Sequence, residues 1–343
     1  MQFYNKLNAK EQSDLIDKSG KNRIVLSFYK YSVIGNPKIF RNYLYVKLSA
    51  IDVLGRIYTA NEGINAQISI PLENLPFLRN ELDKITFLKN IRLNYALESE
   101  NKSFLKLTIK VKDKIVADGL ESQKIDLSKR GTYVNALEFN KLLEERDTIC
   151  IDMRNHYESE VGHFKNAITP DVDTFRESLP LIEKTFFNKK SSKNFLLYCT
   201  GGIRCEKASA YFKEKGFKKV FQMQGGIIEY AKQIREMKLE NKFKGINFVF
   251  DERKGERISE DVISNCHLCN SSCDSHANCA NPACNLLFIQ CPDCSKAYSG
   301  CCSKDCQTVI NLPEEEQKTL RKSKRNSHKV FKKGRSKALK YKT

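Results

Sequence analysis

The chain has 343 residues, of which 41% are hydrophobic, so it is long enough for two or three folded domains and too apolar for a wholly disordered protein. No apolar stretch reaches the roughly 18 residues that span a bilayer, and the first residues lack the apolar core of a signal peptide. We therefore expect a cytoplasmic protein without membrane contact. The formal net charge of +18 favours a polyanionic partner.

Residues 1–125 are predicted to form a ferredoxin-like α+β sandwich. Apolar periodicity and turn residues predict short strands and two helices in the order β-α-β-β-α-β, which is typical of that fold. The expected strands cover residues 24–29, 55–60, 65–70 and 104–111, and the expected helices cover 37–53 and 71–85.

Residues 126–242 are predicted to form a parallel α/β domain. Expected strands at 148–152, 195–199 and 220–223 are interspersed with helices at 138–146, 205–215 and 227–237. Open parallel sheets carry their sites at the carboxyl ends of strands, and Cys199 ends one of these strands.

Cys199 opens the run Cys-Thr-Gly-Gly-Ile-Arg between a short apolar strand and an amphipathic helix. A cysteine at such a turn faces backbone N–H groups and the positive end of a helix dipole, and both favour the nucleophilic thiolate. The glycines permit the positive φ angles of a tight loop, and Arg204 adds a fixed positive charge. We therefore predict that Cys199 and Arg204 are catalytic. The residues between them are predicted to bind the substrate: Thr200, Gly201, Gly202 and Ile203.

The residues around this loop leave several alternatives open. Cys205 is either a resolving thiol or a packing residue, and the sequence favours packing because nothing in it shows that Cys205 faces Cys199. Asp152 and Arg154 end a strand, where they either orient the loop or form an ordinary ion pair. The sequence contains no Gly-x-Gly-x-x-Gly motif for a flavin or nicotinamide and no 2-His-1-carboxylate pattern for non-haem iron.

Residues 243–312 are predicted to be a linker, over the charged stretch 248–260, followed by a cysteine-rich module. Ten of the 13 cysteines lie there, and Cys-x-x-Cys spacings in a cytosolic protein favour structural zinc over disulfides. Ten cysteines suffice for two four-thiolate sites with two to spare, but the spacing does not show which share an ion. His267 and His276 are expected to be unnecessary as ligands. The candidate ligands are Cys266, Cys269, Cys273, Cys279, Cys284, Cys291, Cys294, Cys301, Cys302 and Cys306.

Residues 313–343 are predicted to be a disordered basic tail. No acidic residue follows Glu316, and 12 lysines and arginines fall between Lys318 and Lys342. The rest of the chain then has 47 basic and 41 acidic residues, a net charge of +6, so the tail carries two-thirds of the charge. Such a tail suits a phosphate backbone, and the alternative is a solubilising end without a specific partner.

Several motifs of the second domain resemble those of rhodanese domains. They are Asp152-Met153-Arg154, Gly162-His163-Phe164-Lys165-Asn166-Ala167, the Cys199 run, Gly216-Phe217-Lys218-Lys219-Val220 and Gln224-Gly225-Gly226-Ile227. The resemblance implies that Cys199 is the position that forms a persulfide and that His163 belongs to a structural turn.

A narrower resemblance is to bacterial oxygen-dependent tRNA uridine hydroxylases. It rests on the run from Tyr198 to Ala208, on Ala60-Asn61-Glu62-Gly63-Ile64-Asn65, on Phe248-Val249-Phe250-Asp251-Glu252-Arg253 and on Asn278-Cys279-Ala280-Asn281. The resemblance implies hydroxylation of the wobble uridine of tRNA at C5, with molecular oxygen as co-substrate and the anticodon loop as partner. It also raises a substrate-contact role for Glu62 and Asn65, although turn formation is the simpler explanation for both residues. The basic tail matches none of these motifs.

Two other functions remain as alternatives. Cys199 could carry persulfide sulfur to an acceptor as a sulfurtransferase, or the chain could be a non-catalytic tRNA-binding protein. Four residues separate Cys199 from Arg204, and this loop suits a single sulfur anion better than the wider five-residue loop of related phosphatases. Whether Cys199 acts as thiolate, as persulfide or as nucleophile toward the base stays open at this point.

Overall fold

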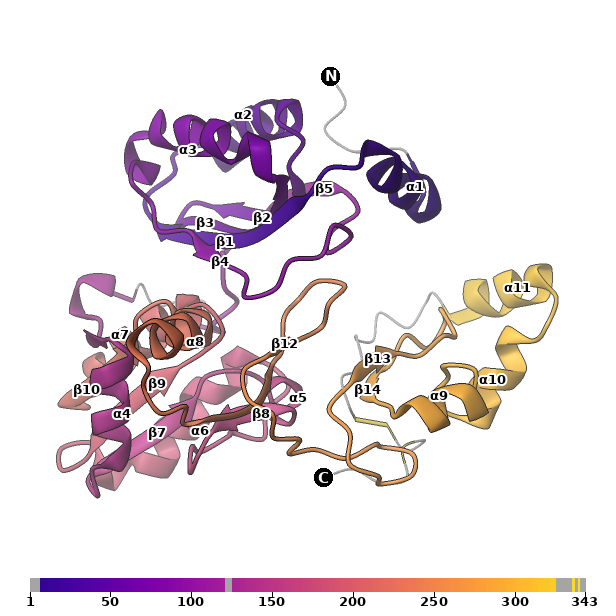
Figure 1. Cartoon of the computed structure of the whole chain (residues 1–343). Coiled ribbons are helices and arrows are strands. Elements are labelled where there is room, and N and C mark those ends of the chain that lie inside the picture. The colour runs from indigo at the N-terminus through magenta and orange to yellow at the C-terminus, as the bar shows by residue number, and fades with distance from the viewer. Residues whose placement is uncertain (1–6, 121–124, 325–334, 337–338, 340–343) are drawn as a thin grey trace.

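The computed structural model describes residues 7–120, 125–324, 335–336 and 339. Figure 1 shows the N-terminal sheet with its helices, the central α/β part in magenta to orange, and the cysteine-rich part in orange to yellow. Among these residues, no helix has both the length and the apolar character needed to cross a membrane. The predicted fold class is confirmed in all three parts.

The first domain is a five-stranded sheet with helices on one face. The strands β1 (Arg23–Tyr31), β2 (Leu54–Ala60), β3 (Gly63–Pro71), β4 (Asn94–Tyr95) and β5 (Leu107–Val111) lie in the order β4-β1-β3-β2-β5. Helices α2 (Pro37–Ala50) and α3 (Leu75–Asp83) provide the two helices of the β-α-β-β-α-β order. A further helix, α1 (Ala9–Ser19), precedes the sheet and was not predicted.

One strand of this domain differs from the prediction. The strand expected at 104–111 is β5, which forms one edge of the sheet and pairs in parallel with β2. The strand beside β1 is β4, whose two residues are too few to show an alternating pattern in the sequence.

The two faces of this sheet have different side chains. Leu26, Phe28 and Ile68 point into the core with the helices, while the alternate residues Ser27 and Gln67 lie on the other face. That open face faces the second domain.

The second domain is built on a parallel sheet of four strands. They are β6 (Thr132–Val134), β7 (Thr148–Asp152), β9 (Asn194–Tyr198) and β10 (Lys219–Met223), in the order β6-β10-β9-β7. Its helices are α4 (Ala136–Glu144), α5 (His156–Ser159), α6 (Phe175–Phe186), α7 (Ile203–Glu214) and α8 (Gly226–Met237). Separate apolar clusters cover the two faces of the sheet, as expected for a sheet with helices on both sides. The short strand β6 was not predicted.

The segment 248–260 is not the free linker that its charges suggest. It follows β11 (Phe243–Asn247) and contains β12 (Glu256–Arg257), and these two strands form a small sheet with β8 (Gly162–Phe164). Phe248 and Glu256 are buried. Arg253 pairs with Asp251 and Glu256 at 2.6 Å each and donates to the backbone of Glu98 in the first domain. Internal ion pairs explain why a charged stretch packs between two domains.

The cysteine-rich part contains β13 (His276–Asn278), β14 (Leu287–Ile289), α9 (Pro292–Ala297) and α10 (Lys304–Ile310). It continues into α11 (Glu314–Lys324), so the expected disorder of the tail is wrong for these residues. Three glutamates in the first turn favour the helix through its dipole, and Lys318 pairs with Glu314 and Glu315 along it. Most of the basic tail beyond Lys324 lies outside the described residues, and the RNA-binding prediction for it stays a prediction.

Short 3-10 helices complete the fold at Leu72–Asn74, Thr86–Leu88, Leu127–Lys129 and Phe187–Lys189.

Candidate active site

Cys199 lies in the loop between β9 and α7, as predicted. Its side chain is buried, and its Sγ accepts a hydrogen bond from the Gly202 backbone N–H at 3.1 Å. Gly202 has a φ of +99°, and a Cβ there would lie 2.9 Å from the Tyr29 hydroxyl. Gly201 has no positive φ, and a Cβ there would meet only Asn94 Nδ2, at an ordinary contact distance of 3.9 Å. Only the second of the two glycines is therefore required by the loop conformation.

The surroundings of Cys199 favour its thiolate. Burial alone raises the pKa of the thiol, but several opposing contacts outweigh burial. They are a hydrogen bond from the Cys205 side chain, the charge of Arg204 and the backbone N–H groups of both residues, and together they lower the pKa of Cys199 to about 6. Burial, the Cys199 side chain and the Cys199 charge raise the pKa of Cys205 well above its ordinary value. Cys205 is therefore a protonated donor to Cys199 and not merely a packing residue.

Arg204 is held in place by a buried carboxylate. Its two terminal nitrogens lie 2.7 and 2.8 Å from the oxygens of Glu158, a bidentate pair, and Nη2 also lies 3.4 Å from Thr200 Oγ1. Burial raises the pKa of Glu158, but the Arg204 charge and hydrogen bonds more than compensate, and the pKa of Glu158 is lowered. Arg204 thus presents a permanent charge beside the loop from a fixed position.

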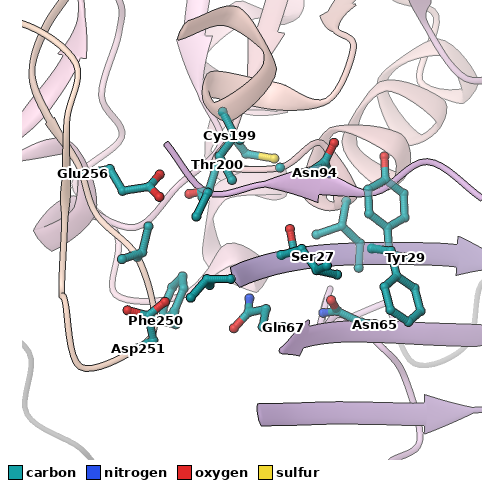
Figure 2. Close-up of a pocket in the computed structure, with 18 of the residues that line it drawn as sticks. Ser27, Tyr29, Asn65, Gln67, Asn94, Cys199, Thr200, Phe250, Asp251 and Glu256 are labelled. Carbon is teal, nitrogen blue, oxygen red and sulfur yellow. The ribbon is translucent and has the colours of Figure 1, made fainter. Parts of the chain in front are cut away.

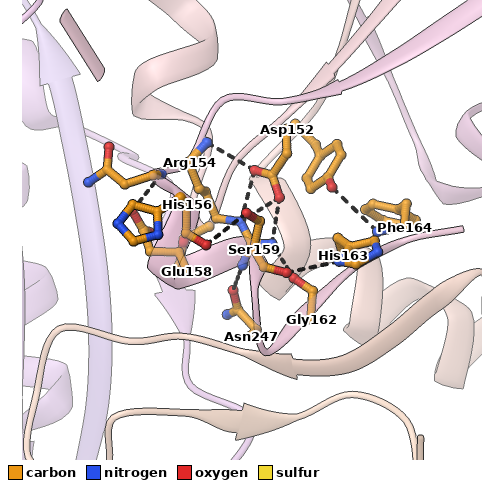
Figure 3. Close-up of polar contacts among 12 residues, drawn as sticks. Asp152, Arg154, His156, Glu158, Ser159, Gly162, His163, Phe164 and Asn247 are labelled. Carbon is orange, nitrogen blue, oxygen red and sulfur yellow. Dashed lines mark hydrogen bonds and ion pairs between the residues drawn. The ribbon is translucent and has the colours of Figure 1, made fainter. Parts of the chain in front are cut away.

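Asp152 and Arg154 form a fully buried ion pair at 2.6 Å, away from the cavity. Arg154 also donates to the Gly162 carbonyl and to Asn247 Oδ1, as Figure 3 shows, so it joins the end of β7 to β8 and β11. This arrangement favours the structural alternative for the pair.

The two histidines near the loop have structural contacts. His163 Nδ1 lies 2.8 Å from the Ser159 carbonyl, and His156 pairs with Asp173 at 3.0 Å. Neither histidine lines the cavity beside Cys199.

A cavity of about 230 Å³ lies where the Cys199 loop, the open face of the first sheet and the segment 249–256 meet. The loop contributes Cys199, Thr200, Gly201, Ile203 and Arg204, so five of the six predicted catalytic and substrate-binding residues line the cavity, and Gly202 does not. The first domain contributes polar side chains, and Figure 2 shows them opposite the thiol. These are Ser27, Tyr29, Asn65, Gln67 and Asn94.

Of these first-domain residues, only Asn65 was a candidate from the sequence. Asn94 is nearly buried, and its Oδ1 accepts a hydrogen bond from Arg92 Nε at 3.2 Å, which leaves Nδ2 as a donor close to Gly201. Arg92 is in turn paired with Glu229 at 2.7 Å. Polar alternation along β1 and β3 is the signal that could have identified this wall, because it predicts a sheet face that no helix covers.

Four contacts seat the loop and its helix against the first sheet and the chain that follows it. The Tyr29 hydroxyl donates to Glu206 at 3.0 Å, and the Tyr31 hydroxyl donates to the Ile203 carbonyl at 3.1 Å. Lys207 is buried and pairs with Glu62 at 2.8 Å and with Asp118 at 2.6 Å. Glu62 is thus engaged in holding α7, while Asn65 lines the cavity.

Eight of the ten candidate cysteine ligands form two groups of four. One group is Cys266, Cys269, Cys291 and Cys294, and the other is Cys279, Cys284, Cys302 and Cys306. The structure leaves Cys273 and Cys301 out of both groups, which corrects their prediction as ligands, because each group already has the four thiols of a tetrahedral site. The two groups alternate along the chain, pair by pair.

The geometry of both groups suits a tetrahedral metal ion. Within each group all ligand atoms lie within 4.8 Å of one another, and Sγ–Sγ distances are 3.6 Å for Cys269 and Cys291 and 3.7 Å for Cys284 and Cys302. Metal–sulfur bonds of about 2.3 Å in a tetrahedron give sulfur–sulfur edges of about 3.8 Å. Each group can therefore hold a metal ion.

Family models match each of the three parts of the chain. A UPF0176 acylphosphatase-like domain matches residues 23–115, a rhodanese-like domain matches residues 135–233, and a rhodanase C-terminal domain matches residues 244–307.

Full-length relatives share about half of the sequence. A protein of Photorhabdus laumondii named tRNA uridine(34) hydroxylase is 50% identical over 334 residues, which cover 97% of this chain and 95% of that protein. Proteins of the same name from Leptospira interrogans (50% identity, 93% of this chain and 87% of that protein) and Cronobacter sakazakii (51%, 91% and 90%) are similar to it as well. The chain therefore belongs to the tRNA uridine(34) hydroxylase family.

Proposed function

We propose that the protein hydroxylates C5 of the uridine at position 34 of tRNA, with molecular oxygen as the oxidant. In this reaction one oxygen atom enters the base and the other leaves as water, with two electrons from a cellular reductant. The protein would then be an oxidoreductase of the monooxygenase type. The full-length family relationship supports this substrate, and the cavity beside Cys199 supports the site.

The observation that carries the proposal is that the acidic thiol of Cys199 faces uncharged polar side chains of the first domain across the cavity. The pKa of about 6 makes Cys199 a thiolate at neutral pH. Across the cavity, the amides of Asn65, Gln67 and Asn94 offer donors and acceptors, which are the groups that read the O2, N3–H and O4 edge of uracil. An enzyme that acts on a base usually takes it out of the stack into such a pocket.

Cys199 is the proposed reactive group, as thiolate or as the persulfide formed on it. Arg204, fixed by Glu158, is proposed to hold the negative charge on sulfur, and Thr200, Gly201 and Ile203 to shape the loop side of the base pocket.

We also propose that both cysteine groups hold structural zinc. Four thiolates and no open position are typical of structural zinc sites. Cys266 and Cys294 are buried in the module core, where the ion would tie together the loops that surround its small apolar cluster.

The test compares tRNA treated under air with tRNA treated without oxygen. The purified protein is incubated with unmodified tRNA and a cell extract as electron source, and nucleosides are analysed by mass spectrometry. We expect one added oxygen at uridine 34 under air only, and none with Cys199→Ala. Cys150→Ala is the matched control, since Cys150 is a buried cysteine of β7 that does not line the cavity.

Three results would contradict the proposal. If Cys199→Ala incorporated oxygen at the normal rate, Cys199 would not take part in the reaction. Sulfur transfer from thiosulfate, without any oxidised nucleoside, would indicate a sulfurtransferase, and tRNA binding without either product would indicate a binding protein.

A further inference from the structure

The polar face that lines the cavity continues across the first sheet beyond it. Ser27 and Gln67 line the cavity, and Arg56 of β2 lies opposite Gln67 on the same face. Figure 2 shows Ser27 and Gln67 on adjoining strands beneath the loop. The first row of side chains therefore runs from the cavity to an arginine outside it.

A second row runs in parallel one step along the strands. Tyr29 and Asn65 line the cavity, Tyr58 lies opposite Asn65, and Lys110 of β5 lies opposite Tyr58. Because residues directly opposite in a sheet share a face, the ring of Tyr58 stands between the cavity wall and the cation of Lys110.

These outer residues have no partners within the part of the chain that the structure describes. Arg56 and Lys110 are exposed, Tyr58 is half-buried, and none of the three makes an ion pair or a side-chain hydrogen bond with another described residue. By contrast, the cations nearer the loop are committed, Lys207 to Glu62 and Asp118 and Arg92 to Glu229. The outer side chains are free to bind something else.

The charge of the sheet indicates a polyanion. The five strands contain no aspartate or glutamate, and Arg56 and Lys110 are the unpaired cations on this face. Of the other two cations, Arg23 is buried and pairs with Asp52, and Lys30 lies opposite Ile64 on the other face. An aromatic ring flanked by unpaired cations on an open sheet face is the arrangement with which proteins bind single-stranded nucleic acid, by stacking a base on the ring and pairing phosphates with the cations.

We propose that this face, defined by Arg56, Tyr58 and Lys110, binds the anticodon-loop nucleotides that adjoin the base in the cavity. A neighbouring base stacks on Tyr58, and Arg56 and Lys110 pair with backbone phosphates. The proposal rests on tRNA as the substrate. The face is assigned to the nucleotides next to the target base because the same two rows of side chains line the cavity and continue onto this face.

The test measures binding of unmodified tRNA to the full chain without oxygen, so that no turnover occurs. We expect Tyr58→Ala to weaken binding about tenfold, and Tyr58→Phe to restore most of that loss because stacking needs the ring only. The double variant Arg56→Ala, Lys110→Ala should lower the slope of log affinity against log salt by about 1.4, the value for two phosphate contacts of a single strand.

The matched control is the double variant Lys38→Ala, Lys89→Ala, which removes two exposed lysines from the same domain outside this face. It should leave the salt slope unchanged. If the Arg56 and Lys110 variant behaves like this control, or if Tyr58→Ala binds as tightly as the parent, the proposal is overturned. Tight, Tyr58-dependent tRNA binding without any hydroxylation under air would instead overturn the proposed function and leave this surface standing.

Discussion

Cys205 follows Arg204 directly in α7, and its thiol hydrogen-bonds to Cys199. The sequence favoured a packing role, because the direction of a side chain at the start of a helix depends on how that helix meets the strand before it. Cys199 itself was predictable from its local pattern, since the loop N–H groups and the helix N-terminus come from consecutive residues.

We predict that Cys205→Ala raises the pKa of Cys199, because the thiolate loses a hydrogen-bond donor. Cys205→Ser is the matched control, since its hydroxyl can still donate. The measurement is the ultraviolet absorbance of the thiolate against pH, taken as the difference from the same protein with Cys199→Ser. A midpoint that stays at about pH 6 in Cys205→Ala would show that the donor is not needed.

The same pKa has a consequence for stability. The pKa of Cys199 in the folded protein, about 6, lies below the ordinary value of 9.0, so the thiolate form stabilises the fold. Relative to Cys199→Ser, the stability contribution should be complete above pH 9, and it should be lost as the pH falls to 6.

At the scale of elements, the strand–loop–helix unit of β9 and α7 depends on one glycine conformation. Gly202 adopts the left-handed region and Gly201 does not, although the two are adjacent and look equivalent in the sequence. The sequence indicated that the loop needs a glycine, but it could not show which of the two glycines has the positive φ. The φ angle at each position depends on how the loop packs against Tyr29 and α7.

We predict that Gly202→Ala destabilises the protein by about 1–3 kcal/mol, because alanine is strained at that φ and its Cβ meets the Tyr29 hydroxyl. Gly201→Ala is the matched control and should cost less than about 1 kcal/mol, since its Cβ would make only an ordinary contact with Asn94 Nδ2 at 3.9 Å. Denaturant unfolding of the two variants provides the comparison. Equal costs would contradict the role given to Gly202.

At the scale of the whole molecule, the three parts are joined at the cavity and at the cysteine module. The module packs on the second domain through Tyr157 and Val161, and buried His267 pairs with Glu160 at 2.7 Å. Within it, the two cysteine groups alternate along the chain, so each metal ion would close a loop that contains ligands of the other.

We predict two zinc ions per chain, and a loss of at least one on Cys291→Ser. Because the groups interlock, the second site should also release zinc to a chelator faster in this variant. Cys273→Ser is the matched control, since Cys273 belongs to neither group and should leave two ions bound. Metal content by mass spectrometry distinguishes the outcomes, and loss of zinc from Cys273→Ser would contradict the assignment.

The sequence by itself determined the fold class, the cysteine loop, the family and the presence of a cysteine-rich module able to hold metal. Each of these is carried by residues close together in the chain or by a pattern with a fixed period. The tertiary structure decided the cavity wall of Ser27, Gln67 and Asn94, the pairing of Arg204 with Glu158, and the division of the cysteines into two groups. These features join residues far apart in sequence, and only the folding of each domain brings these residues into contact.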